Sequence, residues 1–339
     1  MSYGAPVSED RASTTSRRLL TAEEIATQAG GAIPFLRLPV RASVFADRAA
    51  RLRALAPGHA MADFLEFAAC IADEQHALLG AMAPARLPDA ERIAQCNAHG
   101  LPPLGFATLP RDPAWRTGLR SLLAALAAHT PGNAHAVIDA LRRQGDDYLE
   151  AQASKLLAGV MRGLDIAHAP LIGAALQVAF TNMALSVDAA AIRPLPEAAL
   201  CPCCGHRPVA SVVRIGGADG GYRFLHCGLC SVEWHFVRIT CANCRGTKGI
   251  GYQAIDDGTA AGKHAVQAEV CQACSHYTKI CYQDRNPLVD PVADDLATLS
   301  LDLLLGDAGL QPTGVNYLLV HGEPAAAPDP QRPASLPTP

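Results

Sequence analysis

Residues 225–244 read LHCGLCSVEWHFVRITCANC. This stretch contains two pairs of cysteines, Cys227/Cys230 and Cys241/Cys244, and two residues separate the members of each pair. Two cysteines at this spacing can bind one metal ion when the chain between them makes a tight turn. We call such a pair with its turn a knuckle. The stretch therefore predicts two metal-binding knuckles joined by a short connection.

Four such knuckles occur in the second half of the chain, because the same spacing recurs on either side of this stretch. Ten of the twelve cysteines lie between positions 201 and 281. A tetrahedral ion of the Zn²⁺ or Fe²⁺ type takes four thiolates, so four knuckles predict two closed sites with one ion each. The predicted ligands are Cys201, Cys204, Cys227, Cys230, Cys241, Cys244, Cys271 and Cys274.

Small residues support the turns that these knuckles need. Gly205, Ser231 and Ser275 directly follow the second cysteine of three knuckles, and Pro202 stiffens the first. The connections between successive knuckles contain 22, 10 and 26 residues, and a β-hairpin fits into the two longer ones. Sequential pairing is therefore predicted over interleaved pairing. Site one then contains the first four cysteines of the set, and site two contains the last four.

The cysteines are expected to stay reduced. Arg17-Arg18 is followed by polar residues instead of the apolar segment of an export signal, so we predict a cytoplasmic protein. In that compartment, clustered cysteine pairs favour metal binding over disulfides. A thioredoxin-like dithiol is disfavoured because such a motif would not recur four times. An iron–sulfur cluster stays open as an alternative, and spacing alone does not separate zinc from iron.

Composition argues against a protein whose affinity depends on neutralising many phosphates. The net charge is −4 and the pI is near 6.3. Residues 197–285 contain nine Lys/Arg against seven Asp/Glu, which gives no strongly basic face. A zinc-ribbon protein that binds nucleic acid is therefore only a minor alternative.

The pattern along the chain predicts an α+β protein. Residues 21–192 are rich in Ala and Leu and predict an all-α helical domain. Short β-type runs follow and predict two small β-rich modules of the zinc-ribbon type, at 193–239 and 240–290, each with one four-cysteine site. A C-terminal helix is predicted at 291–310. The polar segment 1–20 and the proline-rich segment 322–339 are predicted to be disordered.

Apolar spacing predicts the individual elements. Helices are expected at 45–55, 61–82, 113–129, 134–144, 148–162 and 171–187. The last of these lies in an uncharged stretch close to the length of a membrane span, but polar residues interrupt it, so a core helix without membrane insertion is predicted. Strands are expected at 208–215, 222–226, 233–239 and 250–254, and the glycine-rich segment 216–221 is expected to be a hairpin turn.

The remaining cysteines are not predicted to be ligands. Cys203 and Cys281 have no partner at ligand spacing and are interpreted as packed or bystander thiols, whereas Cys70 and Cys96 are interpreted as structural. Nearby histidines are expected outside the metal sites, because the cysteines already complete each set. Four-cysteine sites leave no position for a substrate, and no Ser/His/Asp, P-loop or paired-carboxylate motif is found. We therefore predict that the chain is not an enzyme.

The stretch 225–244 resembles the FdhE family of accessory proteins for formate dehydrogenase maturation. The resemblance extends to Cys201-Pro-Cys-Cys-Gly205, to Glu269-Val-Cys-Gln-Ala-Cys274 and to residues 294–302. More loosely it includes residues 48–79, so that it covers roughly residues 20–320.

This resemblance implies a cytoplasmic helper that is not itself an oxidoreductase. It implies binding to the molybdopterin-containing catalytic subunit of a respiratory formate dehydrogenase before that subunit is exported. It also implies rubredoxin-like sites at the eight knuckle cysteines, and it favours iron over zinc for the two mononuclear ions. The alternative function is a rubredoxin-like electron or sulfur carrier, for which two iron sites would suffice chemically. The oligomeric state, including a homo-oligomer, stays open.

Overall fold

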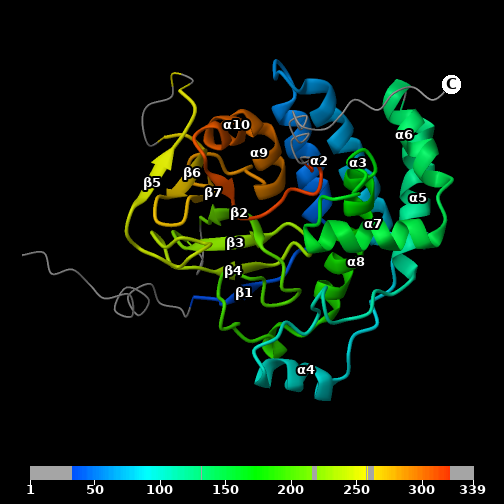
Figure 1. Cartoon of the computed structure of the whole chain (residues 1–339), viewed down its shortest axis with the longest axis horizontal. Helices are drawn as coiled ribbons and strands as arrows, with labels where there is room; N and C mark the ends of the chain where they lie inside the picture. Colours follow the sequence, from blue (N-terminus) through cyan, green and yellow to red (C-terminus); the bar gives the residue numbers. More distant parts are fainter. Residues whose placement is uncertain (1–32, 131, 216–219, 257, 259–262, 321–339) are drawn as a thin grey trace, which may run out of the picture.

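The computed structural model describes residues 33–130, 132–215, 220–256, 258 and 263–320. The segments predicted to be disordered, 1–20 and 322–339, lie outside these residues, as does most of the turn predicted at 216–221. Helices form the first part of the described chain, and strands dominate the second part (Figure 1). The predicted α+β class, with two four-cysteine groups in the strand-rich part, is confirmed.

Three helices of the first part, α3, α5 and α7, pack against α8 (Ala169–Ser186). Among the described residues, α8 is the one helix long and apolar enough to cross a membrane, but 72% of it is buried inside the molecule. Such burial is typical of a core helix. The other helices here are α2 (Val44–Leu55), α3 (Ala62–Ala81), α4 (Ala90–Ala98), α5 (Ala114–His129), α6 (Gly132–Arg142), α7 (Asp146–Ala158) and the 3₁₀ helix η1 (Ala189–Ala191).

Apolar residues at helical spacing explain how these helices pack. In α3, Leu65, Ala68, Ala72 and Leu79 recur three, four or seven positions apart and are all buried. α7 ends at Ala158 instead of continuing to residue 162, because the next residue is a glycine in the left-handed conformation, with φ +67°.

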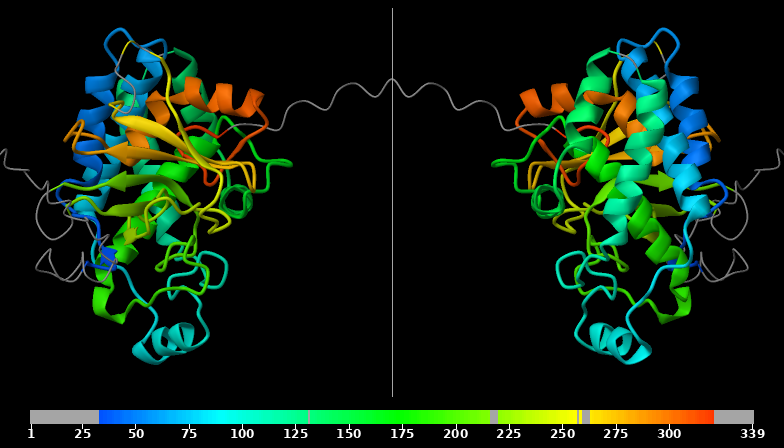
Figure 2. Two further views of the ribbon diagram at one scale, coloured as in Figure 1. Left: turned by 90° about the vertical axis from the view of Figure 1, so that its left-hand side faces the viewer. Right: turned by 90° about the vertical axis from the view of Figure 1, so that its right-hand side faces the viewer.

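The strands form a single sheet that joins the two predicted metal modules. The order across the sheet is β1-β4-β3-β2-β7-β6-β5, and β8 pairs with β7. The sequence predicts separate modules, whereas β2 of the first pairs in parallel with β7 of the second (Figure 2). The strands are β1 (Leu36–Arg37), β2 (Pro208–Val213), β3 (Arg223–Cys227), β4 (Glu233–His235), β5 (Ile250–Gln253), β6 (Val266–Cys271), β7 (His276–Tyr282) and β8 (Gln311–Pro312).

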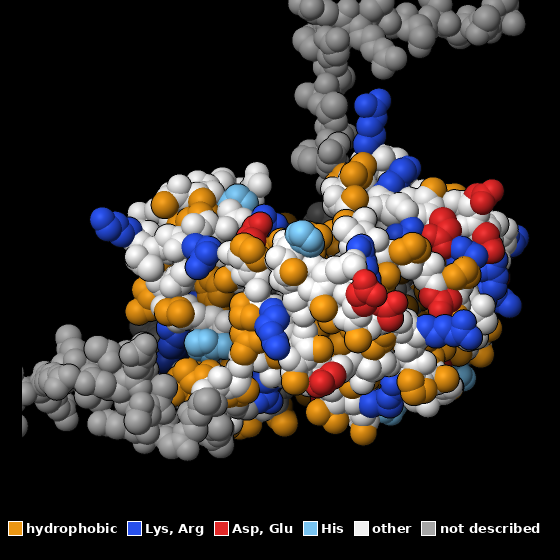
Figure 3. All heavy atoms as spheres, turned by 90° about the horizontal axis from the view of Figure 1, so that it is seen from below, with side chains coloured by type: hydrophobic (Ala, Val, Ile, Leu, Met, Phe, Trp, Pro, Cys, Tyr) orange, Lys and Arg blue, Asp and Glu red, His pale blue; other side chains and the backbone are white. Residues whose placement is uncertain are grey.

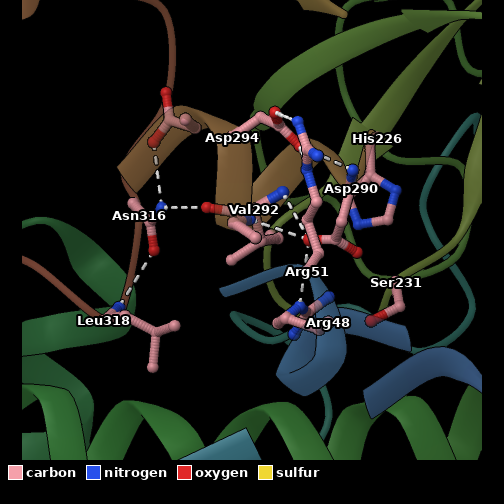
Figure 4. A network of polar contacts seen from close by, with 12 residues as sticks. Arg48, Arg51, His226, Ser231, Asp290, Val292, Asp294, Asn316 and Leu318 are labelled. Carbon is pink, nitrogen blue, oxygen red and sulfur yellow. Dashed lines mark hydrogen bonds and ion pairs between the residues drawn. The ribbon is translucent and has the colours of Figure 1, made fainter. Parts of the chain in front are cut away.

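Two helices that follow the sheet, α9 (Pro291–Ala297) and α10 (Leu299–Asp307), connect it to the helical part. Arg51 of α2 donates two hydrogen bonds to the Asp294 carboxylate, with N–O distances of 3.0 and 2.6 Å. Arg48 Nε lies 3.4 Å from Oδ1 of Asp290, the residue that caps α9. Figure 4 shows α2 and the start of α9 facing each other through these contacts. Removing one partner would leave a buried charge unpaired, so this network fixes the two parts together.

One hydrophobic core crosses the predicted domain boundary. It contains Leu119 and Leu176 from the helices, Leu225 and Trp234 from the sheet, and also the cysteines of the first two knuckles. Trp234 is 2% exposed, and its indole N–H donates to the carbonyl oxygen of Ala198 at 2.8 Å. The first two knuckles are therefore part of the core that the helices and the sheet share.

Candidate metal centres

The structure gathers the eight predicted cysteines into two quartets. Within each quartet, all Sγ atoms lie within 4.8 Å of one another. This grouping is the sequential pairing that the connection lengths predict, and none of the twelve cysteines forms a disulfide. Quartet one is Cys201, Cys204, Cys227 and Cys230, and quartet two is Cys241, Cys244, Cys271 and Cys274.

The sulfur separations match those of a tetrahedral thiolate site. Opposite sulfurs across the two knuckles are 3.5 Å apart in quartet one and 3.7 Å apart in quartet two. A tetrahedron with metal–sulfur bonds of about 2.3 Å has edges of about 3.8 Å, whereas a disulfide bond is about 2.0 Å long. An iron–sulfur cluster would spread its thiolates around several iron atoms, so the short separations favour one ion per quartet. Four thiolates suit zinc or iron, and the donor set does not separate the two metals.

A residue in the left-handed conformation follows the second cysteine of every knuckle. Gly205, Ser231, Arg245 and Ser275 have φ angles between +56° and +76°. The backbone N–H of each donates to the carbonyl oxygen of the first cysteine in its knuckle, at 2.8 to 3.0 Å. This bond closes the turn and brings both sulfurs to the same side. Arg245 was not expected in this role, because sequence reasoning relied on small residues.

Replacing Gly205 with alanine is expected to destabilise the protein more than the same change at Gly58. The two φ angles are +76° and +75°, so both variants carry the left-handed cost of about 1–2 kcal/mol. The new Cβ at Gly205 would lie 2.8 Å from Pro102 Cγ, whereas nothing lies within 4 Å of a Cβ at Gly58. Thermal unfolding of the metal-loaded proteins should show the larger fall in Tm for Gly205→Ala. Equal falls would mean that packing against Pro102 does not hold the first knuckle.

Quartet one is enclosed by protein. Its four cysteines are 0% exposed. The loop before α5 contacts the first knuckle through the backbone N–H of Leu104, which donates to the carbonyl oxygen of Cys203 at 2.9 Å. The buried Tyr317 places its hydroxyl 2.5 Å from Nε2 of His206, two residues after the first knuckle. The helical part and the C-terminal segment therefore shield this quartet from solvent.

Quartet two reaches the surface. Cys241 and Cys271 are buried, but Cys274 is only partly buried and Cys244 is exposed. Asn243 contacts two of the sulfurs: its backbone N–H donates to Cys241 at 3.3 Å, and its side-chain amide lies 3.6 Å from Cys274. Desolvation opposes ionisation, but hydrogen bonds from Asn243 and the other three thiols lower the pKa of Cys274 to about 7. A metal ion held here would have an exposed edge.

The other cysteines lie outside the quartets. Cys203 is 0% exposed beside Cys201, and its hydrogen bond to that sulfur is the main reason why its pKa rises well above the usual value. Cys281 is also 0% exposed and packs in a small apolar cluster of the sheet. Cys96 is buried and Cys70 is partly buried in the helical part. All four are therefore packed thiols in this structure.

Histidines support the knuckles without entering the quartets. His226 Nδ1 lies 3.1 Å from Glu233 Oε1, and His276 Nδ1 lies 2.7 Å from the carbonyl oxygen of Cys274. Glu233 also pairs with Arg214. Burial opposes the ionisation of Glu233, but Arg214 and His226 together lower its pKa to about 2. Sequence reasoning missed this charged group, because Arg214 follows β2 and Glu233 begins β4, and β3 lies between these two strands in the sheet.

Family models and curated relatives match most of the described chain. Three models of the FdhE family match in succession: the N-terminal model at residues 33–197, the central-domain model at 200–238 and the C-terminal-domain model at 239–319. A relative from Salmonella dublin, Protein FdhE, is 40% identical over 292 residues, which is 86% of this chain and 93% of the relative. A Protein FdhE homolog from Pseudomonas aeruginosa is 39% identical over 291 residues, or 85% of this chain and 94% of the relative.

The fold also matches a solved structure. The crystal structure of the FdhE protein from Pseudomonas aeruginosa superposes with a TM-score of 0.77 at 37% sequence identity. The match covers 86% of this chain and 100% of that chain. Sequence and fold are thus similar to FdhE proteins along most of the molecule.

Proposed function

The chain belongs to the FdhE family, and from this membership we propose that it is a cytoplasmic accessory protein for formate dehydrogenase. In this role it binds the catalytic subunit of a respiratory formate dehydrogenase and supports maturation of that enzyme. Each quartet holds one metal ion in a rubredoxin-like site, with iron favoured over zinc. The chain acts as a binding protein and not as a catalyst.

The observation that carries this proposal is the contrast between the two quartets. Quartet one is part of the core, whereas quartet two brings Cys244 to the surface. A closed four-cysteine site provides no open coordination position, which supports a structural role for quartet one. An exposed site on a rigid sheet can present its knuckles to a protein partner. The face shown in Figure 3 carries acidic as well as basic side chains, and residues 197–285 contain nine Lys/Arg against seven Asp/Glu, which does not favour nucleic acid as that partner.

Affinity purification tests the proposal. Tagged, metal-loaded protein should retain the formate dehydrogenase catalytic subunit from cells that produce this enzyme anaerobically. The double variant Cys244→Ser/Cys274→Ser should retain less of the subunit, because it disrupts the exposed site while the core site stays intact. Cys70→Ser is the matched control, since Cys70 belongs to neither quartet. Failure of the wild-type protein to retain the subunit would rule out the binding function.

A further inference from the structure

A cavity of about 500 Å³ lies beside the sheet, lined by side chains of β3, β5, β6 and β7 and of the connection that follows β4. Three arginines line it, Arg223, Arg238 and Arg285, together with one carboxylate, Glu269. No quartet cysteine lines this cavity. Its volume falls within the range of about 300–1,000 Å³ that is typical of ligand pockets.

Arg223 is the buried cation of this cavity. Its side chain is 0% exposed, and Nη1 lies 2.8 Å from Glu269 Oε1 and 3.1 Å from the carbonyl oxygen of Thr240. Nε and Nη2 are also buried, and they have no hydrogen-bond partner among the described residues. Of the five N–H donors of this guanidinium, three are therefore unmatched. The guanidinium also lies 5.6 Å from the centre of the Phe236 ring, and Glu269 is the one carboxylate that pairs with it among the described residues, so its positive charge lies beneath the cavity with unmatched donors.

The other two arginines add positive charge that no carboxylate of the cavity neutralises. Arg238 is exposed and makes no hydrogen bond or ion pair with the described residues. Arg285 donates to the carbonyl oxygen of His264 and to Gln267, and its guanidinium lies 3.5 Å from the centre of the Tyr282 ring. Its contacts are thus with neutral groups, and the aromatic ring fixes the guanidinium plane. Glu269 is already occupied by Arg223 and by the hydroxyl of Tyr252, which donates to it at 3.0 Å.

We propose that this cavity binds an oxyanion, either a phosphate group or the carboxylates of an acidic peptide. Arg238 and Arg285 would pair with the oxygens at the mouth of the cavity, and the buried Arg223 would add positive charge beneath its floor. Three arginines against one glutamate make the cavity locally positive, although the net charge of the whole protein is −4. The preference for anions is therefore a property of this cavity and not of the whole surface. Guanidinium groups form charge-assisted, often bidentate hydrogen bonds to phosphate and carboxylate alike. Oxyanion binding in this cavity would be separate from the proposed role of the quartets, because it requires neither a metal ion nor the formate dehydrogenase subunit.

Isothermal titration calorimetry tests the proposal on the full-length, metal-loaded protein. Inorganic phosphate and a tetraglutamate peptide are titrated separately at one fixed ionic strength, and the metal content is measured before and after. Saturable binding of either probe at one site per chain is expected. Tighter binding of phosphate assigns the site to phosphate ligands, and tighter binding of the peptide assigns it to acidic segments of proteins.

The variant Arg238→Glu should weaken this binding at least ~10-fold, because it replaces an attractive charge at the mouth with a repulsive one. Arg238 is exposed and outside every described ion pair, so the fold should be unaffected, and the Tm checks this. Arg92→Glu at the exposed start of α4 is the matched control with the same change in net charge. Non-saturable binding of both probes would overturn the proposal. Equal weakening by the two variants would also overturn it, because only the overall charge would then matter.

Discussion

Replacing Cys204 with serine is expected to cost most of the folding stability of the metal-loaded protein, about 5 kcal/mol or more. Cys204 is 0% exposed and lies in the core that joins the helices to the sheet. Binding of a structural zinc ion contributes about 10–16 kcal/mol in zinc-finger peptides, whereas whole domains are typically stable by only about 5–15 kcal/mol. The loss of one thiolate in a site closed to water also leaves a buried hydroxyl with poor partners. Thermal and chemical unfolding, followed by far-UV circular dichroism, measure the effect.

Cys244→Ser is the matched control for this experiment. It makes the same change, cysteine to serine, at the exposed member of quartet two. This variant is expected to remain folded and to contain one metal ion per chain, against two in the wild-type protein. If Cys204→Ser proved as stable as Cys244→Ser, the buried quartet would not be a structural metal site.

Metal is expected to leave quartet two at least ~100-fold faster than quartet one. A chelator can approach the exposed edge at Cys244 directly, whereas access to quartet one requires the shared core to open. Each ~1.4 kcal/mol of opening free energy slows such release about tenfold, and core opening costs several times that amount. A chromogenic chelator added to zinc-loaded protein should report two phases of one ion each.

The variant Cys244→Ser should abolish the fast phase and leave the slow phase unchanged. Release of both ions in a single phase would contradict the difference in accessibility between the quartets. An exchange of metal between the sites could merge the phases, and loading with one equivalent of isotopically distinct zinc detects this exchange.

The composition of the quartets could be predicted from the sequence because a knuckle is local. Two cysteines three positions apart suffice to define it, and even Arg245 adopts the left-handed conformation that closes the turn. The difference in burial between the quartets could not be predicted in this way. It arises because the helical part and Tyr317 enclose quartet one, and both contacts join residues far apart in the chain.

β6 and β7 escaped prediction because buried charged residues interrupt their apolar pattern. Glu269 and Lys279 are 4% and 1% exposed. Lys279 Nζ lies 2.6 Å from Asp302 Oδ2 of α10, and Glu269 pairs with Arg223 of β3. These partners make the burial of both charges favourable, but they lie far away in the sequence. A prediction from the residues next to each charge therefore does not include them.

α4 was also not predicted from the sequence. The helix has only nine residues, Ile93 is its one large aliphatic side chain, and only Cys96 is buried, so the segment is too short for its apolar spacing to stand out. Its first turn carries the missed signal, because the Asp89 side chain accepts a hydrogen bond from the backbone N–H of Arg92 at 2.8 Å.

The position of β2 in the sheet has a consequence for synthesis on the ribosome. β2 lies between β3 and β7, but β3 ends at Cys227 and β7 begins only at His276. At about 5–20 residues per second, the nascent chain therefore carries β2 with one open edge for several seconds. Open strand edges recruit other unpaired strands, so this edge is a site for wrong pairing until β7, which follows the fourth knuckle, has been synthesised.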